Sequence, residues 1–511
     1  MHEKILILDF GSQYTRLIAR KIRENNVYCE IHNFDYIPEK LDNIKGIVLS
    51  GGPSSVYEKD ALEPGDWLWK TNLPILGICY GMQYITKKFD GEITEGVTRE
   101  YGSAQIIIKE KSILFEDTPL KQNVWMSHSD IIEESPPNFN VTAYSENNII
   151  AAFENVKDKI YGIQFHPEVK HTEYGKTIIK NFLYNICGCS GDWKMEDFIK
   201  EKIKEIQDIV QNKKVILGLS GGVDSTVASV LMHKAIGNNL TCFFIDNGLL
   251  RKNEMQKVKE NFKTLNPNIK IEYIDASEKF LSKLKGISDP EEKRKIIGHT
   301  FIEVFEEGLK ERAPGAEFLV QGTLYPDVIE SSSHKGPSAT IKTHHNVGGL
   351  PEKMNLKIIE PFRELFKDEV REVGKQLGIS EKIINRHPFP GPGLAVRILG
   401  EISKEKLEIL REVDEIFINE LIKNNLYNKI SQALAVLLPI KSVGVMGDQR
   451  TYQYVTALRA VVTTDFMTAD IYEFELKFLK DIARKIINNV KGVNRVVYDI
   501  SSKPPATIEW E

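Results

Sequence analysis

The sequence contains few cysteines, no long hydrophobic run and no excess of basic residues. Five cysteines in 511 residues are few, and their number is odd, so we expect a reduced, cytoplasmic protein and not a disulfide-linked secreted one. No apolar run approaches the ~20 residues of a membrane-spanning helix. The first ten residues already have the pattern of a strand, so we expect no signal peptide and no membrane contact. The formal net charge of −5 argues against nucleic acid as a partner.

The apolar segments alternate between strand-like and helix-like periodicity, which predicts an α/β protein. At ~150 residues per domain, the length suggests about three domains. A small-residue linker at 187–193 and a segment with three prolines at 387–393 are typical of domain boundaries. We therefore predict domains at residues 1–190, 194–386 and 387–511.

The elements follow from the same periodicities. Strands are predicted at 5–9, 46–50, 75–79 and 160–165 in the first domain, at 214–219, 240–246, 269–275 and 318–321 in the second, and at 395–399, 432–443, 452–462 and 493–500 in the third. Helices are predicted at 14–25, 173–186, 195–211, 227–234, 291–312, 404–424 and 471–490.

The segment Gly-Ile-Cys-Tyr-Gly at 77–81 follows an apolar run and has the pattern of a nucleophile elbow, with cysteine in place of serine. Such a tight turn between strand and helix needs glycine on both sides, because a Cβ there would collide with neighbouring strands. A second apolar run ends at His166, and Glu168 follows. A cysteine nucleophile requires a base and an acceptor that orients the base. Cys79, His166 and Glu168 are therefore a candidate catalytic triad at strand ends.

The string Ser-Gly-Gly-Val-Asp-Ser-Thr at 220–226 follows a β-rich run and precedes a helical segment. Its glycines allow backbone N–H groups to converge, so the loop and the helix N-terminus can bind phosphate. No Walker lysine follows, so this is not the usual loop for transfer of the γ-phosphate. The string instead resembles the loop of enzymes that split ATP between its α- and β-phosphates. The predicted ATP-binding residues are Ser220, Gly221, Gly222, Val223, Asp224, Ser225 and Thr226, with the carboxylate of Asp224 as a ligand for Mg²⁺.

Two polar segments are ambiguous from their pattern. The Gly-rich loop at 343–349 contains His344 and His345 and fits either a solvated loop or a functional lid. Asp289 and Glu292 head a predicted helix, where acidic residues are favourable to the helix dipole without any further role. Zinc chemistry at His166, Cys187 and Cys189 is disfavoured because the Pro-Cys-x-x-Cys motif of zinc deaminases is absent.

Five strings together resemble one family over nearly the whole chain. They are Leu-Asp-Phe-Gly-Ser-Gln-Tyr at 8–14, Ser-Gly-Gly-Pro at 50–53, the 220–226 string, the segment 387–399 and the final residues 501–511. On these strings the chain resembles the family of glutamine-hydrolysing GMP synthases. The resemblance implies an N-terminal class I glutaminase domain, a central Rossmann-like ATP-pyrophosphatase domain and a C-terminal α+β dimerisation domain, and hence a homodimer.

The resemblance also implies roles for particular residues. Cys79 would attack glutamine, with the backbone N–H groups of Gly52 and Tyr80 as oxyanion hole; ATP would then adenylate xanthosine 5′-monophosphate (XMP), and ammonia would displace AMP. Residues implied to bind XMP are Arg251, Gln432, Lys503, Ile508 and Glu509. Residues implied to form a lid over the adenylating site are Asp289, Glu292, Lys342, His344 and His345. One departure is Ser129, where the family usually has glycine.

Two other classes compete with this interpretation. A tRNA-modifying adenylating enzyme would use the same ATP loop, and we would expect it to have a basic patch or RNA-binding module and a persulfide-carrying cysteine pair. The net charge of −5, the absence of Cys-x-x-Cys and the predicted glutaminase count against this class. A scaffold with inactive sites would be expected to have lost Cys79, His166 or Asp224, and all three are present. We therefore expect a glutamine-dependent ligase that acts on small molecules.

Overall fold

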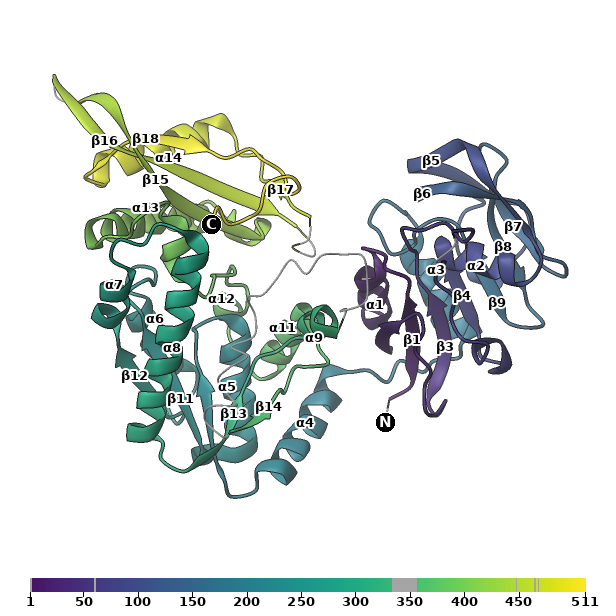
Figure 1. Cartoon of the computed structure of the whole chain (residues 1–511), viewed down its shortest axis with the longest axis horizontal. Helices are drawn as coiled ribbons and strands as arrows, with labels where there is room; N and C mark the ends of the chain where they lie inside the picture. Colours follow the sequence, from purple (N-terminus) through teal and green to yellow (C-terminus); the bar gives the residue numbers. More distant parts are fainter. Residues whose placement is uncertain (1, 59–60, 333–355, 447, 464–465, 467) are drawn as a thin grey trace. The chain divides into compact units, whose positions relative to one another are not determined.

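A computed structural model describes residues 2–58, 61–332, 356–446, 448–463, 466 and 468–511. The chain divides into two compact units (Figure 1). Unit 1 contains Met1–Phe198 and Pro326–Ile341, and unit 2 contains Ile199–Tyr325 and Lys342–Glu511.

Within the described residues of unit 1, nine strands form one sheet in the order β2-β1-β3-β4-β9-β8-β7-β5-β6. The parallel part consists of β1 (Lys4–Asp9), β2 (Tyr28–Asn33), β3 (Ile44–Leu49), β4 (Ile75–Ile78) and β9 (Ile160–Ile163). The antiparallel part consists of β5 (Glu92–Ile108), β6 (Lys121–Glu134), β7 (Asn140–Ser145) and β8 (Ile150–Asn155). The helices are α1 (Thr15–Arg23), α2 (Tyr80–Lys88) and α3 (Gly175–Asn181), which continues into a π-helical turn, η3 (Phe182–Ile186).

The strands β4 and β9 are adjacent and fully buried, as expected for parallel strands covered on both faces. Because they are parallel, their carboxyl ends meet at one edge of the sheet. Cys79 follows β4 directly, and His166 comes three residues after the end of β9. The two predicted reactive residues therefore lie at the same sheet edge.

Among the described residues of unit 2, five parallel strands form a sheet in the order β12-β11-β10-β13-β14. They are β10 (Lys214–Gly218), β11 (Leu240–Asp246), β12 (Ile271–Asp275), β13 (Ala316–Val320) and β14 (Lys357–Ile359). The helices of this part of unit 2 are α5 (Val223–Ile236), α6 (Glu254–Leu265), α7 (Ser277–Leu284), α8 (Pro290–Arg312), α11 (Lys367–Gln376) and α12 (Glu381–Ile384), together with α4 (Met195–Val210) from Ile199 onward. The helix α9 (Tyr325–Ser332) follows β13 in the chain and is assigned to unit 1 from Pro326 onward. The chain starts at the central β10, adds β11 and β12 on one side, and returns to the other side with β13. The loop after β10 therefore lies at a topological switch point, where open α/β sheets bind ligands.

The last part of unit 2 contains a separate, mostly antiparallel sheet (yellow-green in Figure 1). Its strands are β15 (Gln432–Met446), β16 (Gln449–Val462), β17 (Asp470–Ile471) and β18 (Val493–Tyr498), and its helices are α13 (Lys404–Lys423) and α14 (Leu476–Asn489). One apolar cluster contains residues of both sheets' helices and strands, from Ile216 and Phe305 to Phe417 and Val493. The two parts of unit 2 therefore share a continuous core.

The predicted α/β architecture is confirmed, and several local predictions are wrong. Residues 393–397 form a short 3₁₀ helix, η5 (Gly393–Arg397), where a strand at 395–399 was expected. Gly393 has a φ of +63°, and a Cβ there would lie 2.4 Å from the main-chain oxygen of Leu249, so this segment bends tightly against its neighbour. The helix expected at 471–490 begins only at Leu476, because Ile471 pairs with β16. The strands β5 to β8 were not among the strands predicted from the sequence.

Candidate active sites

The backbone of Cys79 has a conformation that side-chain-bearing residues rarely adopt. Its φ is +53° and its ψ is −107°, between the end of β4 and the start of α2. A Cβ on Gly81 would lie 2.4 Å from the main-chain oxygen of Leu49, and a Cβ on Gly77 would lie 2.6 Å from the carbonyl carbon of Gly81. The glycines therefore allow the strand, the turn and the helix to approach closely enough to form the elbow.

His166 and Glu168 form a buried hydrogen-bonded pair beside this elbow. Nδ1 of His166 lies 2.7 Å from Oε1 of Glu168, and the two residues are 2% and 1% exposed. Thr172 donates to the main-chain oxygen of His166 at 2.6 Å, and the main-chain N–H of His166 donates to Trp125 at 2.9 Å. Because Nδ1 pairs with the carboxylate, Nε2 is the nitrogen available to the sulfur of Cys79.

The charges around the imidazole favour its protonated form. Burial lowers the pKa of His166, but the Glu168 carboxylate and the Cys79 sulfur raise it by more, so that it lies well above its ordinary value. A protonated imidazole next to a cysteine stabilises the thiolate, which is the nucleophilic form. The structure therefore brings the predicted triad together in an arrangement suited to nucleophilic attack on an amide.

Two further groups contact the sulfur of Cys79. The main-chain oxygen of Ser127 lies 3.6 Å from Sγ, and Nε2 of Gln164 lies 3.7 Å from it. Sequence reasoning missed Gln164, although its place two residues before His166 puts both on one face of an extended chain. Ser129, the departure from the family pattern, lies in β6 two residues after Ser127, and its hydroxyl donates to Oδ1 of Asp130 at 3.4 Å.

The predicted oxyanion-hole residues lie next to each other. A Cβ on Gly52 would be 3.3 Å from Cγ of Tyr80, and the main-chain N–H of Gly81 donates to Ser50 at 3.1 Å. The loop at 50–52 is thus held against the first turn of α2. Within the described chain, the main-chain N–H groups of Gly52 and Tyr80 make no backbone hydrogen bond. Both remain available to a substrate oxygen.

In unit 2, the predicted phosphate loop joins β10 to α5. Gly221 has a φ of +74°, and the N–H of Gly222 donates to Oγ of Ser220 at 3.2 Å. The helix begins at Val223 and not at Val227, so the predicted residues Val223, Asp224, Ser225 and Thr226 form its first turn. Their N–H groups and the helix dipole point toward the sheet edge, as anion binding requires.

The carboxylate of Asp224 is suited to a cation. Its Oδ2 lies 3.6 Å from Nζ of Lys367, while its Oδ1 is shielded from solvent and accepts no hydrogen bond from the described residues. A carboxylate oxygen without a partner beside a phosphate loop fits Mg²⁺ bound jointly with ATP. No group of three or more His, Cys, Asp or Glu side chains in the described part of the chain could hold a metal by itself.

Two basic residues near the loop were not found from the sequence. Lys367, the first residue of α11, pairs with Asp224, and Arg386 donates to the main-chain oxygen of Gly221 at 3.0 Å. Arg386 also pairs with the buried Glu254 at 2.5 Å. These residues are distant from 220–226 in the chain, so only the fold reveals that they are neighbours.

Of the five residues implied to bind XMP, Gln432, Ile508 and Glu509 lie together, and the carboxylate of Glu509 is at the centre of their contacts. Nε2 of Gln432 donates to Glu509 at 2.7 Å, and Ile508 beside it is 8% exposed. Fully buried Arg397 binds Glu509 through two nitrogens, at 3.0 and 2.8 Å. Arg251 joins this cluster indirectly, because Asp414 lies 3.2 Å from Arg251 and 3.8 Å from Arg397.

The remaining predicted residues lie elsewhere or outside the described chain. Lys503 donates to the main-chain oxygen of Phe466 at 2.7 Å. Asp289 caps the N-terminus of α8 by accepting from the N–H of Glu292 at 2.8 Å, which is the structural role that its position predicts. Lys342, His344 and His345 lie outside the described residues.

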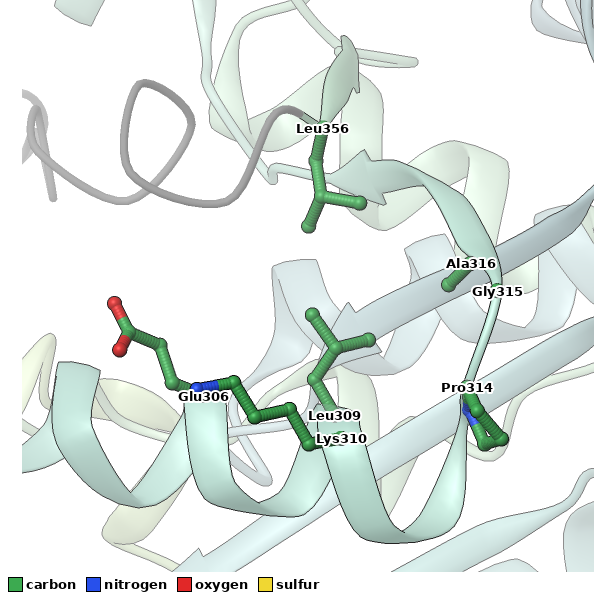
Figure 2. A pocket seen from close by; sticks show the side chains of 7 residues that line it. All are labelled: Glu306, Leu309, Lys310, Pro314, Gly315, Ala316 and Leu356. Carbon is green, nitrogen blue, oxygen red and sulfur yellow. The ribbon is translucent and has the colours of Figure 1, made fainter.

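A surface hollow of about 440 Å³ lies at the other end of the five-stranded sheet (Figure 2). It is lined by Glu306, Leu309, Lys310, Pro314, Gly315, Ala316 and Leu356. Ala316 is the first residue of β13, so the hollow faces the edge opposite to the phosphate loop.

Among the described residues, no helix has the length and apolarity needed to span a membrane.

The side chain of His387 contacts the start of β15, the strand that begins at Gln432. Its ring stacks on Tyr427 with centroids 3.8 Å apart, its Nε2 lies 2.9 Å from the main-chain oxygen of Tyr427, and its Nδ1 accepts from the N–H of Ala433 at 3.2 Å. These bonds require the neutral imidazole with the proton on Nε2. Burial, with Arg251 nearby, lowers the pKa of His387 to about 4.

Comparison with known proteins matches the whole chain to one kind of enzyme. Family models match residues 6–186 (glutamine amidotransferase class-I), 193–296 (NAD synthase) and 419–510 (GMP synthase C terminal domain). A protein of Aquifex aeolicus described as GMP synthase [glutamine-hydrolyzing] is 58% identical over 509 residues, 99% of each chain. One of Cytophaga hutchinsonii with the same description is 55% identical over 512 residues, 100% of each chain. A solved structure from Thermoplasma acidophilum, described as that of a GMP synthase subunit, is 33% identical and covers 37% of this chain and 95% of its own, with a TM-score of 0.34.

The neutral state of His387 predicts a loss of stability in acid. In the unfolded chain the imidazole has its ordinary pKa of 6.5, so as pH falls from 6.5 toward 4 the unfolded state gains a proton that the folded state does not. The free energy of unfolding is therefore unaffected by protonation of His387 well above pH 6.5, and it falls by about 3 kcal/mol as the pH is lowered from 6.5 to 4.

Urea unfolding of wild type and His387→Asn between pH 7 and pH 4 measures this effect. Asparagine retains an acceptor for the N–H of Ala433 but does not titrate, so the stability difference between the two proteins should shrink as pH falls. Parallel pH dependences for the two proteins would contradict the neutral-imidazole assignment.

Proposed function

The chain belongs to the family of glutamine-hydrolysing GMP synthases, and from this premise we propose which of its residues perform each step. It is a carbon–nitrogen ligase that takes its amino group from glutamine, uses ATP, and converts XMP to GMP. The observation that carries the assignment of residues is the hydrogen bond between His166 and Glu168 beside the strained Cys79.

In unit 1, the thiolate of Cys79 attacks the side-chain amide carbon of glutamine. A C–S bond forms, and the negative charge moves to the carbonyl oxygen, where the N–H groups of Gly52 and Tyr80 stabilise it, each by about 3 kcal/mol. His166 gives its proton to the amide nitrogen, the C–N bond breaks, and ammonia leaves. Water activated by His166 then hydrolyses the thioester to glutamate and restores the thiolate.

In unit 2, the loop at 220–226 binds the phosphates of ATP. The C2 oxygen of XMP attacks the α-phosphorus, and pyrophosphate leaves. Ammonia then adds to C2, and the C2 oxygen departs as part of AMP, which leaves GMP. Asp224 would hold Mg²⁺, which would neutralise phosphate charge at this loop. Lys367 and Arg386 add positive charge and hold the loop.

For the acceptor, we propose that Arg251, Gln432, Lys503, Ile508 and Glu509 bind XMP. Their chemistry supports this: Arg251 and Lys503 are suited to the phosphate, and Gln432 and Glu509 to the edges of the purine or ribose. The lid comprises Asp289, Glu292, Lys342, His344 and His345. The domains are those given above, residues 1–190, 194–386 and 387–511, and the protein acts in the cytoplasm.

We propose that the chain forms a homodimer through the β15–β16 hairpin. Several large apolar side chains of this hairpin are exposed: Ile440 (58%), Val443 (45%), Val445 (76%) and Tyr452 (66%). Apolar side chains gathered on one exposed element favour contact with a partner. The exposed antiparallel hairpin offers a surface that a second copy can match by twofold symmetry.

Replacing Cys79 with Ala should separate the two half-reactions. Glutamine-dependent GMP formation should fall by at least about 10³-fold because the nucleophile is lost. Synthesis from ammonium chloride with ATP and XMP should remain within about twofold, because the chemistry of unit 2 does not need the thiol. Cys189→Ala, a buried loop cysteine outside the triad, is the matched control and should retain both activities. Loss of both activities in Cys79→Ala would refute the division of labour.

Replacing Asp224 with Asn should weaken Mg²⁺-dependent binding of ATP by at least about tenfold, because a neutral amide is a poorer ligand than a carboxylate. Isothermal titration calorimetry of ATP with and without Mg²⁺ measures this, and pyrophosphate release should fall in parallel. Asp208→Asn, an exposed residue of α4, is the control and should bind as wild type. Unchanged binding in Asp224→Asn would remove its role as a metal ligand.

Placing charges on the hairpin should convert the dimer to monomer. Val443 and Tyr452 are cross-strand partners, so Val443→Lys with Tyr452→Glu sets opposite charges face to face and keeps the hairpin paired. Analytical ultracentrifugation should give the mass of two chains for wild type and of one chain for the double variant. A wild-type mass of one chain, or an unchanged dimer in the variant, would exclude this surface.

A further inference from the structure

Lys293, on the first turns of α8, is fully buried, which is rare for a lysine. Its Nζ donates to the main-chain oxygens of Ala395 at 3.2 Å and Ile398 at 2.8 Å, and to Oε2 of Glu511 at 2.5 Å. Three acceptors match the three hydrogens of an ammonium group. The buried charge is therefore both neutralised and fully hydrogen-bonded, the only condition under which such burial is tolerated.

Glu511 is held at two further points. Its other carboxylate oxygen accepts from the N–H of Gly400 at 3.3 Å, and its main-chain oxygen accepts from Arg294 at 2.6 Å. Its side chain is 9% exposed. In Figure 1 this end of the chain lies beside the first turns of α8. Residue 511 is thus fixed between α8 and the segment that follows η5.

The residues just before Glu511 include two of the proposed acceptor residues, Ile508 and Glu509. Glu509 is bound by Gln432 and Arg397. Arg397 belongs to η5, between the two residues whose main-chain oxygens bind Lys293. The ammonium of Lys293 therefore joins three pieces of chain that are distant in sequence: α8, η5 with its continuation, and residues 508–511.

We propose that Lys293 is a positioning residue for the nucleotide acceptor. It holds residues 508–511 in the conformation that presents Glu509 and Gln432 together, and it ties them to α8, the helix headed by Asp289 and Glu292. This inference rests on the proposed binding of XMP at Ile508 and Glu509. The sequence around residue 293 does not indicate this role, because the role arises from contacts with residues 102 to 218 positions away in the chain.

The alternative is that the buried pair contributes only to general stability. The two roles differ in what they change. If Lys293 positions the segment, its loss lowers the fraction of molecules in which residues 508–511 are ordered. At an ordered fraction of roughly a tenth, the apparent KM for XMP rises about tenfold, while the bound complex reacts as before. A general loss of stability would instead lower the amount of active enzyme and leave KM unchanged.

Lys293→Met, which keeps the length of the side chain, and Glu511→Gln, which keeps its shape, test the proposal with the full chain. Ammonia-dependent pyrophosphate release should show a KM for XMP raised about tenfold in Lys293→Met and a kcat within about threefold of wild type. The double variant should resemble Lys293→Met, because both changes remove the same contact. Lys404→Met is the control: it breaks the exposed pair with Glu278 (69% and 79% exposed side chains) and should leave KM unchanged.

Amide hydrogen exchange of the same variants gives a readout that does not require XMP. Exchange at residues 506–511 should accelerate in Lys293→Met, while β10 and β11 keep wild-type protection. Unchanged exchange at 506–511, or an equal loss of protection throughout unit 2, would overturn the proposal. If wild type itself releases no pyrophosphate with XMP, the proposed function fails, and the exchange data still decide whether Lys293 holds the segment.

Discussion

Backbone geometry that glycine permits, a close approach of main chains in unit 1 and a positive φ in unit 2, is the constraint on which both reactive sites depend. In unit 1, Gly77 and Gly81 let β4, the turn at Cys79 and α2 pack against β3 at distances that a Cβ would occupy. This packing holds Cys79 at a positive φ, so that its sulfur projects from the sheet edge toward His166. In unit 2, Gly221 at φ +74° turns the chain out of β10, so that α5 starts with its N–H groups at the sheet edge. The chemistry differs between the two sites, but each is built where a parallel sheet ends and a helix begins.

In unit 2, buried cationic side chains determine where the segment around residues 507–511 lies. Arg397 and Arg459 are fully buried, and both bind the segment around residue 508, Arg397 through Glu509 and Arg459 through the main-chain oxygens of Thr507 and Ile508. Lys293 adds a third buried cation at Glu511. Burying a charge is costly unless it is fully paired, so this arrangement tolerates only one placement of the segment. A precise geometry of the acceptor site is the expected consequence.

The sequence predicted the parts of each site that a local pattern identifies. Cys79, His166 and the loop at 220–226 each end an apolar run, and polar residues at the end of a parallel strand are a strong signal. Gln164, Lys367 and Arg386 were missed, because their proximity to these residues arises from packing between distant segments. The strand expected at 395–399 was wrong for a related reason: its apolar residues are buried, but the approach of Gly393 to Leu249 imposes a 3₁₀ turn. The antiparallel strand β6 was not predicted although its burial alternates along the strand, because the buried positions Gln122, His128 and Asp130 are polar and leave no continuous apolar alternation in the sequence. In β5 and β7 the pairing contains register shifts, which interrupt the expected pattern.

The central claim is that ATP activates the acceptor by adenylating its C2 oxygen in unit 2. The most direct test is to supply XMP labelled with ¹⁸O at C2, together with ATP, Mg²⁺ and glutamine, and to analyse the products by mass spectrometry. The account predicts GMP without label, one ¹⁸O in the phosphoryl group of AMP, and unlabelled pyrophosphate. Label in pyrophosphate or in water, with unlabelled AMP, would show that ATP activates something other than this oxygen and would contradict the account.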